Sequence, residues 1–197
     1  MNEMNKTPST AKEVVALLRD ILGRRGSESY LGEAVTMSEH MLQTAWIAEQ
    51  AQENPSVIVA ALLHDIGHYT SEFGDDYLEL GVDNLHEVTG EKILRSWFPP
   101  EVCEVVRWHV DAKRYLCATE SDYLSGLSEA SVRSLELQRG PMNQHEVRAF
   151  ENNPWIDTIV RVRRYDDGGK VPGRNTPDLE HYLEMVESVL LQYQQSA

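Results

Sequence analysis

The sequence predicts an all-α protein that folds as a single domain over residues 1–197. Apolar residues recur at helical spacing in most segments, and capping residues or prolines stand where these segments begin. No segment alternates apolar and polar residues as a half-buried strand would. The chain is long enough to bury a core without disulfides, and no repeat, low-complexity tract or long linker divides it.

The first half of the chain predicts four helices. They begin at Ser9 or Thr10, Thr36, Pro55 and Asn84, and they end at Gly23 or Gly26, Gln52, His64 and Phe98. Thr36 and Glu39 have the spacing of a capping box, and Pro55 suits the first turn of a helix. Polar, glycine-containing residues at 27–35 and 70–76 predict loops.

The second half predicts further, shorter helices. A segment from Glu101 to His109 follows two prolines that end the preceding helix. Three short helices are expected after caps at Ser121, Ser128 and Asn143. The last two helices are expected from Pro154 to Asp166, and from Thr176 and Pro177 onward.

The composition excludes several classes of function. Thirty-two acidic residues against eighteen basic ones give a net charge of −14, which argues against a nucleic-acid-binding surface. No run approaches the ~18 apolar residues of a membrane span, and the first six residues form no apolar leader. Cys103 and Cys117 show no metal-binding or disulfide spacing. We therefore expect a cytoplasmic protein, with no prediction of its oligomeric state.

An apolar run at 57–63 leads into adjacent His64 and Asp65, followed by Gly67 and His68. Imidazole and carboxylate are ligands that Fe, Mn and Zn accept. A His-Asp pair alone is more often a polar cluster at a helix end than a metal site. At the inner end of a buried helix, however, such groups are costly unless they are paired or bound to metal.

Histidines stand on four different expected helices or helix ends, namely His40, His64, His86 and His109. With Asp65 and the late Asp166 they give the order H, HD, H, H, D. In this order the sequence resembles the HD-domain superfamily of all-α metalloproteins, so the fold expected is an HD-domain helical bundle. The resemblance implies one metal on His40, His64, Asp65 and Asp166, and a second on Asp65, His86 and His109, with Asp65 bridging.

The loops carry a closer resemblance. Tyr30-Leu-Gly-Glu33, the segment 109–116, the segment 123–131, Gly140-Pro-Met142 and Arg163-Arg-Tyr-Asp166 are similar to those of HD-domain mixed-valent diiron oxygenases, the PhnZ and TmpB type. These enzymes cleave the C–P bond of 1-hydroxyphosphonates, and myo-inositol oxygenase is a more distant relative. The similarity covers a core at roughly 30–191 and leaves a preceding helix at roughly 9–25.

The expected pocket must hold an anion and a cation. A phosphonate needs convergent cationic or hydroxyl donors, and a substrate ammonium could pair with Glu33 beneath the ring of Tyr30. The resemblance implies catalytic roles for Tyr30, Glu33, His68 and Lys113. It implies substrate contacts for the same four residues and for Ser131 and Arg163. It also implies that Tyr30 and Glu33 form a mobile lid, with the tyrosine approaching the second iron until substrate binds.

The resemblance implies an Fe(II)/Fe(III) pair that uses O2 as co-substrate to cleave a 1-hydroxy-2-(trimethylammonio or amino)ethylphosphonate. The products would be phosphate and glycine betaine or glycine. We favour the trimethylammonio substrate, because the chain departs from the amino-substrate enzyme at many positions flanking the pocket. Candidates for an aromatic wall around it are Tyr30, Trp46, Tyr69, Tyr115, Tyr123 and Tyr165.

Two other classes of function stay open. Most HD domains are phosphohydrolases, which would use two metals to cleave a nucleotide or phosphomonoester. A non-catalytic sensor is the third class, although a chain without a working site has no physical need for four imidazoles and two carboxylates at the ligand positions.

Overall fold

The computed structural model describes residues 8–69 and 81–196. Within these ranges the chain forms nine α-helices and two short 3-10 helices, and the only β pairing is an isolated bridge between Ser29 and Thr36. The all-α prediction is confirmed. The expected loop at 70–76 and the first six residues, for which no leader was expected, lie outside the described residues.

The α-helices are α1 (Ala11–Arg25), α2 (Met37–Gln50), α3 (Pro55–Leu63), α5 (His86–Leu94), α6 (Pro100–Thr119), α7 (Glu129–Leu137), α8 (Gln144–Phe150), α9 (Ile156–Gly168) and α10 (Leu179–Ser196). The 3-10 helices are η1 (Ile66–Tyr69) and η2 (Leu124–Gly126). None of the described helices is both long and apolar enough to cross a membrane.

Several expected caps are present. Thr10 and Thr36 each form a capping box with a glutamate three residues later. Asn143 forms a third capping box at the start of α8, and the Ser128 side chain accepts a hydrogen bond at the start of α7. These side chains satisfy amides that have no partner within the first helical turn, so each helix begins where the sequence predicted.

Other boundaries differ from the prediction. Helix α6 does not end at His109 but continues to Thr119, because neither glycine nor proline interrupts residues 110–119. The helix expected after Ser121 is a turn followed by η2. Helix α10 begins two residues after Pro177, where the carboxylate of Asp178 accepts a hydrogen bond from the amide of His181.

Asn84 was expected to cap the fourth helix, and that prediction is wrong. The N-cap residue of α5 is Leu85, in the left-handed conformation with φ of 48°. The oxygen of Asn84 instead accepts hydrogen bonds from the backbone amide and the ring of His86. The side chain that resembled a cap therefore holds a residue of the site.

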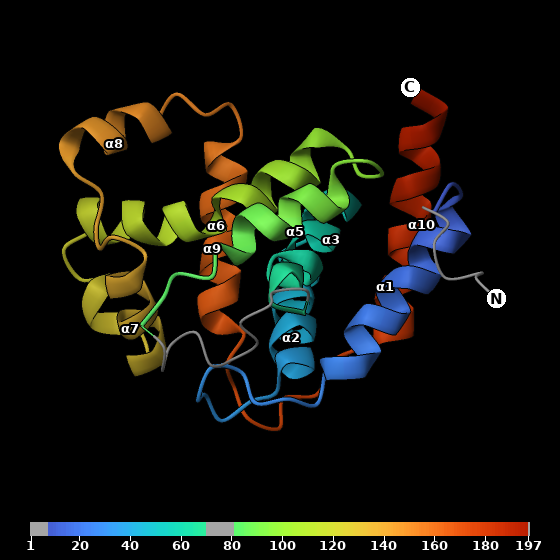
Figure 1. Cartoon of the computed structure of the whole chain (residues 1–197), viewed down its shortest axis with the longest axis horizontal. Coiled ribbons are helices and arrows are strands. Elements are labelled where there is room, and N and C mark those ends of the chain that lie inside the picture. Colours follow the sequence, from blue (N-terminus) through green and yellow to red (C-terminus); the bar gives the residue numbers. More distant parts are fainter. Residues whose placement is uncertain (1–7, 70–80, 197) are drawn as a thin grey trace.

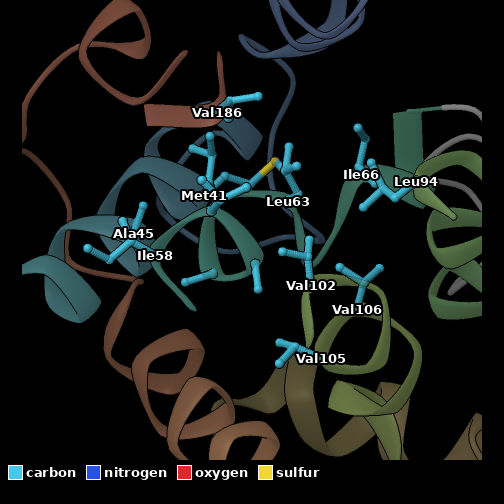
Figure 2. Close-up of a cluster of buried hydrophobic side chains, with 14 of the residues drawn as sticks. Met41, Ala45, Ile58, Leu63, Ile66, Leu94, Val102, Val105, Val106 and Val186 are labelled. Carbon is cyan, nitrogen blue, oxygen red and sulfur yellow. The ribbon is translucent and has the colours of Figure 1, made fainter. Parts of the chain in front are cut away.

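The helices form a bundle around α3 (Figure 1). Helix α3 packs against α2, α6, α9 and α10, while α1 lies beside α10 at one side of the molecule. Figure 2 shows the apolar side chains that surround the end of α3, among them Met41, Leu63, Ile66 and Val106. The end of α3 thus lies inside the molecule, and the His-Asp pair that follows it is buried.

Candidate active site

Six side chains from separate elements converge beside the end of α3. We call them the His-Asp cluster, and its members are His40, His64, Asp65, His86, His109 and Asp166. Each is exposed by no more than 3%. They come from α2, the segment after α3, α5, α6 and α9. The residues that the sequence singled out as metal ligands are therefore brought together by the fold.

The two oxygens of Asp65 face two different groups. Oδ2 lies 3.6 Å from Nε2 of His40 and 3.3 Å from Nε2 of His64. Asp166 closes this side, with Oδ1 3.4 Å from Nε2 of His40. Oδ1 of Asp65 lies 3.4 Å from Nε2 of His86 and 3.3 Å from Nε2 of His109. One carboxylate thus divides the cluster into two sets of ligand atoms.

Each histidine of the cluster is oriented through its other ring nitrogen. Nδ1 of His40 lies 3.0 Å from the carbonyl oxygen of Gly169. Nδ1 of His64 and Nδ1 of His109 each lie 2.8 Å from a carbonyl three residues earlier in their own segment. Nδ1 of His86 lies 2.9 Å from the side-chain oxygen of Asn84. Oxygen acceptors require a proton on every Nδ1, so in each neutral ring the lone pair of Nε2 faces the centre.

These lone pairs meet in two pairs. Nε2 of His40 and Nε2 of His64 are 3.1 Å apart, and Nε2 of His86 and Nε2 of His109 are 3.0 Å apart. Facing lone pairs repel unless a cation lies beside them, and two nitrogens about 2.1 Å from one metal at a right angle are about 3 Å apart. Oδ1 of Asp166 is buried without a hydrogen-bond partner among the described residues. The donor set fits metal ions.

Two glycines allow this close packing. A side chain at Gly67 would place its Cβ 1.9 Å from the carbonyl oxygen of His86. A Cβ at Gly169 would lie 2.5 Å from Oγ1 of Thr44 and 3.2 Å from Nδ1 of His40. All three distances are shorter than an ordinary contact of a Cβ atom. The backbone after the His-Asp pair and the backbone after α9 can therefore approach the histidines only where no side chain intervenes.

The electrostatics of the cluster favour positive charge. Burial lowers the pKa of His64, but the carboxylates of Asp65 and Asp166 more than compensate and raise it to about 9. Burial raises the pKa of Asp65, yet the neighbouring histidines hold it well below the usual range. Asp166 behaves in the same way, with Arg163 as the main charge that lowers its pKa. The cluster stabilises a cation at its centre, whether a proton or a metal ion.

A small pocket opens onto the side of His86 and His109. Its walls include Lys113, Arg163 and Lys170, which we call the cationic cradle. Lys113 is exposed by only 3%, and its ammonium donates to the hydroxyl of Ser134 at 2.7 Å. No carboxylate in the described part of the chain lies within ion-pair distance of it. Burial, together with Arg163, lowers the pKa of Lys113 to about 7. This ammonium lacks an anion.

The other two cations of the cradle have partners. Arg163 binds Asp166 at 2.7 Å and Asp167 on its other amino group, so it also orients a member of the His-Asp cluster. Lys170 donates to the hydroxyl of Ser131 at 2.9 Å and lies 4.0 Å from Asp166. The sequence reasoning missed Lys170. It lies four residues after Asp166, the last residue expected of that helix, and beyond Gly168 and Gly169.

Tyr30 and Glu33 form the opposite wall of the pocket. The hydroxyl of Tyr30 donates to Oδ2 of Asp65 at 2.9 Å, and its ring stacks on His40 with 4.0 Å between centroids. Glu33 accepts a 2.5 Å hydrogen bond from Ser128 at the start of α7. The enclosed space measures about 20 Å³, which holds about one water molecule. A molecule much larger than water does not fit this space.

Of the six aromatic residues considered as a wall for a quaternary ammonium, only Tyr30 lines this pocket among the described residues. Trp46 lies under Arg174, and Tyr165 donates to Glu53. Tyr123 donates to Asp167 and accepts from Arg163, behind the cradle. Periodicity alone could not separate these aromatic residues from Tyr30, because each of them occupies a helical or turn position beside the core.

Comparison with known proteins assigns the family. Residues 37–147 match the family model of the HD domain. Over 177 residues, 90% of each chain, the sequence is 50% identical to the [1-hydroxy-2-(trimethylamino)ethyl]phosphonate dioxygenase (glycine-betaine-forming) of Leisingera caerulea. The chain belongs to the HD-domain family, on its phosphonate dioxygenase branch. The family resemblance expected from the sequence is confirmed.

Two further relatives of this HD-domain protein cover most of its length. A hydroxymethylphosphonate dioxygenase of Gimesia maris is 44% identical over 188 residues, 95% of this chain and 92% of the relative. An uncharacterized protein, L432, of Acanthamoeba polyphaga mimivirus is 34% identical over 164 residues, 82% of this chain and 74% of the relative. The two named relatives share a phosphonate in their names and differ in the group attached to it.

Proposed function

We propose that this HD-domain protein cleaves the C–P bond of a 1-hydroxyphosphonate with O2, and that its substrate is the 2-trimethylammonio compound, giving phosphate and glycine betaine. The observation that carries the proposal is the position of Lys113. Its buried ammonium, without a carboxylate partner within the described residues, lines a pocket that opens on the His-Asp cluster. An anion bound beside the metal site would supply the charge that this ammonium needs.

Two iron ions, Fe(II) and Fe(III), are the proposed metals. His40, His64, Asp65 and Asp166 would hold one, and Asp65, His86 and His109 the other. The facing Nε2 atoms and the two-sided carboxylate of Asp65 support this division. When bound, the iron pair supplies the redox chemistry that lets O2 react with a C–H bond. The remaining residues bind and orient the substrate.

The cradle binds the phosphonate in this proposal. Lys113 supplies the charge, and the neighbouring Ser131 and Lys170 supply further donors. Arg163 is already paired with carboxylates, so its first task is to hold Asp166 in place, and its contact with the phosphonate is secondary. The 1-hydroxyl group would then face the His86 and His109 side of the cluster, onto which the pocket opens.

Tyr30 and Glu33 serve the other end of the substrate. The ring of Tyr30 can cover a quaternary ammonium, and Glu33 can balance its charge once Ser128 releases it. Because the pocket holds about 20 Å³, the wall that carries both residues must move when substrate binds. Such a movement would correspond to the lid that the family resemblance implies for the two residues.

The reaction balances with one O2 for each substrate. The carbon that loses phosphorus is oxidised to a carboxylate, phosphorus leaves as inorganic phosphate, and the two atoms of O2 account for the added oxygen. The trimethylammonio group does not react. We propose this substituent because the relative named for the trimethylamino compound is 50% identical to this chain. The relative named for hydroxymethylphosphonate is 44% identical.

Phosphate release from iron-loaded protein, with and without O2, tests the proposal. The substrates to compare are the trimethylammonio compound, its 2-amino analogue and hydroxymethylphosphonate, with a phosphomonoester as control. We expect release only with O2, and fastest from the trimethylammonio compound. Release from the phosphomonoester without O2 would contradict the oxygenase and support an HD-domain phosphohydrolase. Fastest release from another phosphonate would correct the substituent alone.

A further inference from the structure

One amide joins a proposed metal ligand to a residue of the substrate pocket. Asn84 is buried just before α5. Its oxygen lies 2.9 Å from Nδ1 of His86, and its nitrogen lies 3.1 Å from Nδ1 of His68. The rings of His68 and His86 stack with 3.9 Å between centroids and 20° between planes. A single side chain therefore contacts the same ring atom of two adjacent histidines.

The orientation of this amide follows from its third contact. The Asn84 oxygen also lies 3.3 Å from the backbone nitrogen of His86. A backbone amide can only donate, so the atom that faces it must be the carbonyl oxygen of Asn84. The NH2 group must then face His68. The assignment rests on a partner whose role cannot change, and not on a choice between two similar side-chain atoms.

The two histidines must then carry their protons on opposite nitrogens. His86 donates from Nδ1 to an oxygen, which leaves the lone pair of Nε2 facing Asp65 and His109. His68 accepts at Nδ1 from the NH2 group, so the proton of its neutral ring is on Nε2. That nitrogen lies 3.8 Å from Oδ1 of Asp65, and His68 lines the pocket.

We propose that Asn84 is a positioning residue that makes His86 a lone-pair donor toward metal and His68 a neutral hydrogen-bond donor toward the phosphonate. The second role rests on the proposed function, whereas the proton positions do not. A neutral N–H is suited to a pocket that already holds the cationic cradle, because it contacts the anion without adding another charge.

The backbone beside Asn84 supports a dedicated arrangement. Leu85 adopts φ of 48°, a region that residues with a side chain rarely occupy, and half of its side chain is exposed. Such a conformation is unfavourable for a residue with a side chain and persists only where the surroundings impose it. Asn84 and His86 flank Leu85, and the hydrogen bond between their side chains spans this residue.

The proton positions are measurable by NMR. In protein labelled with 15N-histidine and loaded with diamagnetic zinc, long-range 1H–15N spectra distinguish a proton on Nδ1 from one on Nε2. With seven histidines in the chain, His68→Gln assigns the signal of His68. We expect His86 to be protonated on Nδ1 and His68 on Nε2. A proton on Nδ1 of His68 in the unsubstituted protein would overturn the proposal.

The substitution Asn84→Asp tests the same proton positions in a second way. Aspartate has nearly the same shape but offers only acceptors, so Nδ1 of His68 should gain a proton while Nδ1 of His86 keeps its own. Leu85→Gly is the control, because it relieves the strained backbone and leaves the amide in place. It should leave both histidine signals unchanged. An unprotonated Nδ1 of His68 in Asn84→Asp would contradict the role of the amide.

A double-mutant cycle tests the link to the pocket, with methylphosphonate as the probe. We expect His68→Ala to weaken its binding about tenfold, as the loss of one hydrogen bond would, and Asn84→Ala to weaken it by a similar factor. If Asn84 acts through His68, the double variant should be no weaker than His68→Ala. Multiplied losses would show independent roles and overturn the link. Neither this cycle nor the spectra require C–P cleavage.

Discussion

The His-Asp cluster and the cationic cradle lie side by side but are held in opposite ways. Every histidine of the cluster is fixed by an oxygen acceptor on Nδ1, so the inner nitrogen of each neutral ring offers a lone pair. In the cradle, the ammonium of Lys113 contacts a hydroxyl and a carbonyl group, and no carboxylate among the described residues lies within ion-pair distance of it. The cluster is therefore prepared for cations, and Lys113 for an anion. The charge missing from each region supports the proposal that the cluster binds metal and the cradle binds the phosphonate.

The largest effect is expected where the two halves of the cluster meet. Asp65→Ala removes the oxygens that face both ligand sets, so we expect loss of both metals and of detectable O2-dependent phosphate release. Metal content per chain by elemental analysis measures this, with circular dichroism to confirm that the helices persist. Two irons at full occupancy in this variant would refute the bridging role.

Lys113→Met should impair the cationic cradle and leave the His-Asp cluster intact. We expect both metals to remain, while methylphosphonate binding weakens by about 1.5–3 kcal/mol, a factor of about 10 to 150, because a charged donor is lost. The ligand-free protein should become more stable, because a buried ammonium that has no carboxylate partner among the described residues is replaced by an apolar chain of similar length. Calorimetric titration and thermal unfolding measure the two effects. A less stable variant would show that Lys113 already has its counter-charge.

Lys170→Met should have a smaller effect in the same direction. Its ammonium is less buried than that of Lys113, and it already donates to Ser131 and lies near Asp166. We expect methylphosphonate binding to weaken by about tenfold or less, with metal content unchanged. The same titration measures it beside Lys113→Met. A loss larger than that of Lys113→Met would reverse the order of the two lysines in the cradle.

The smallest expected effect is the pH dependence of methylphosphonate binding. Because the pKa of Lys113 is lowered to about 7, its ammonium loses its proton as the pH rises through that value. The unsubstituted protein should bind methylphosphonate more tightly than Lys113→Met does. The ratio of the two affinities should be largest below a pH of about 7 and should fall above it, by at most about tenfold per pH unit. Comparing the two proteins in the same buffers removes the titration of the ligand itself. If the ratio of the two affinities stayed constant from about pH 6 to about 9, the lowered pKa of Lys113 would be contradicted.

The sequence predicted the cluster better than the cradle for a physical reason. The ligand residues sit at the ends or on the inner faces of helices whose caps and apolar spacing are local signals, as at Thr36 and Pro55. The cradle depends on contacts between distant segments, such as Lys170 with Ser131. Asn84 shows the same limit, because its position before a helix is typical of a cap while its partners are chosen by the fold.

Anomalous diffraction from crystals of the iron-loaded protein, measured at the iron absorption edge, tests the central claim most directly. The account predicts two iron peaks, one on each side of Asp65, the first among His40, His64 and Asp166 and the second beside His86 and His109. A single peak at full occupancy, with the other set of ligands free of metal, would contradict the division of the cluster by one carboxylate.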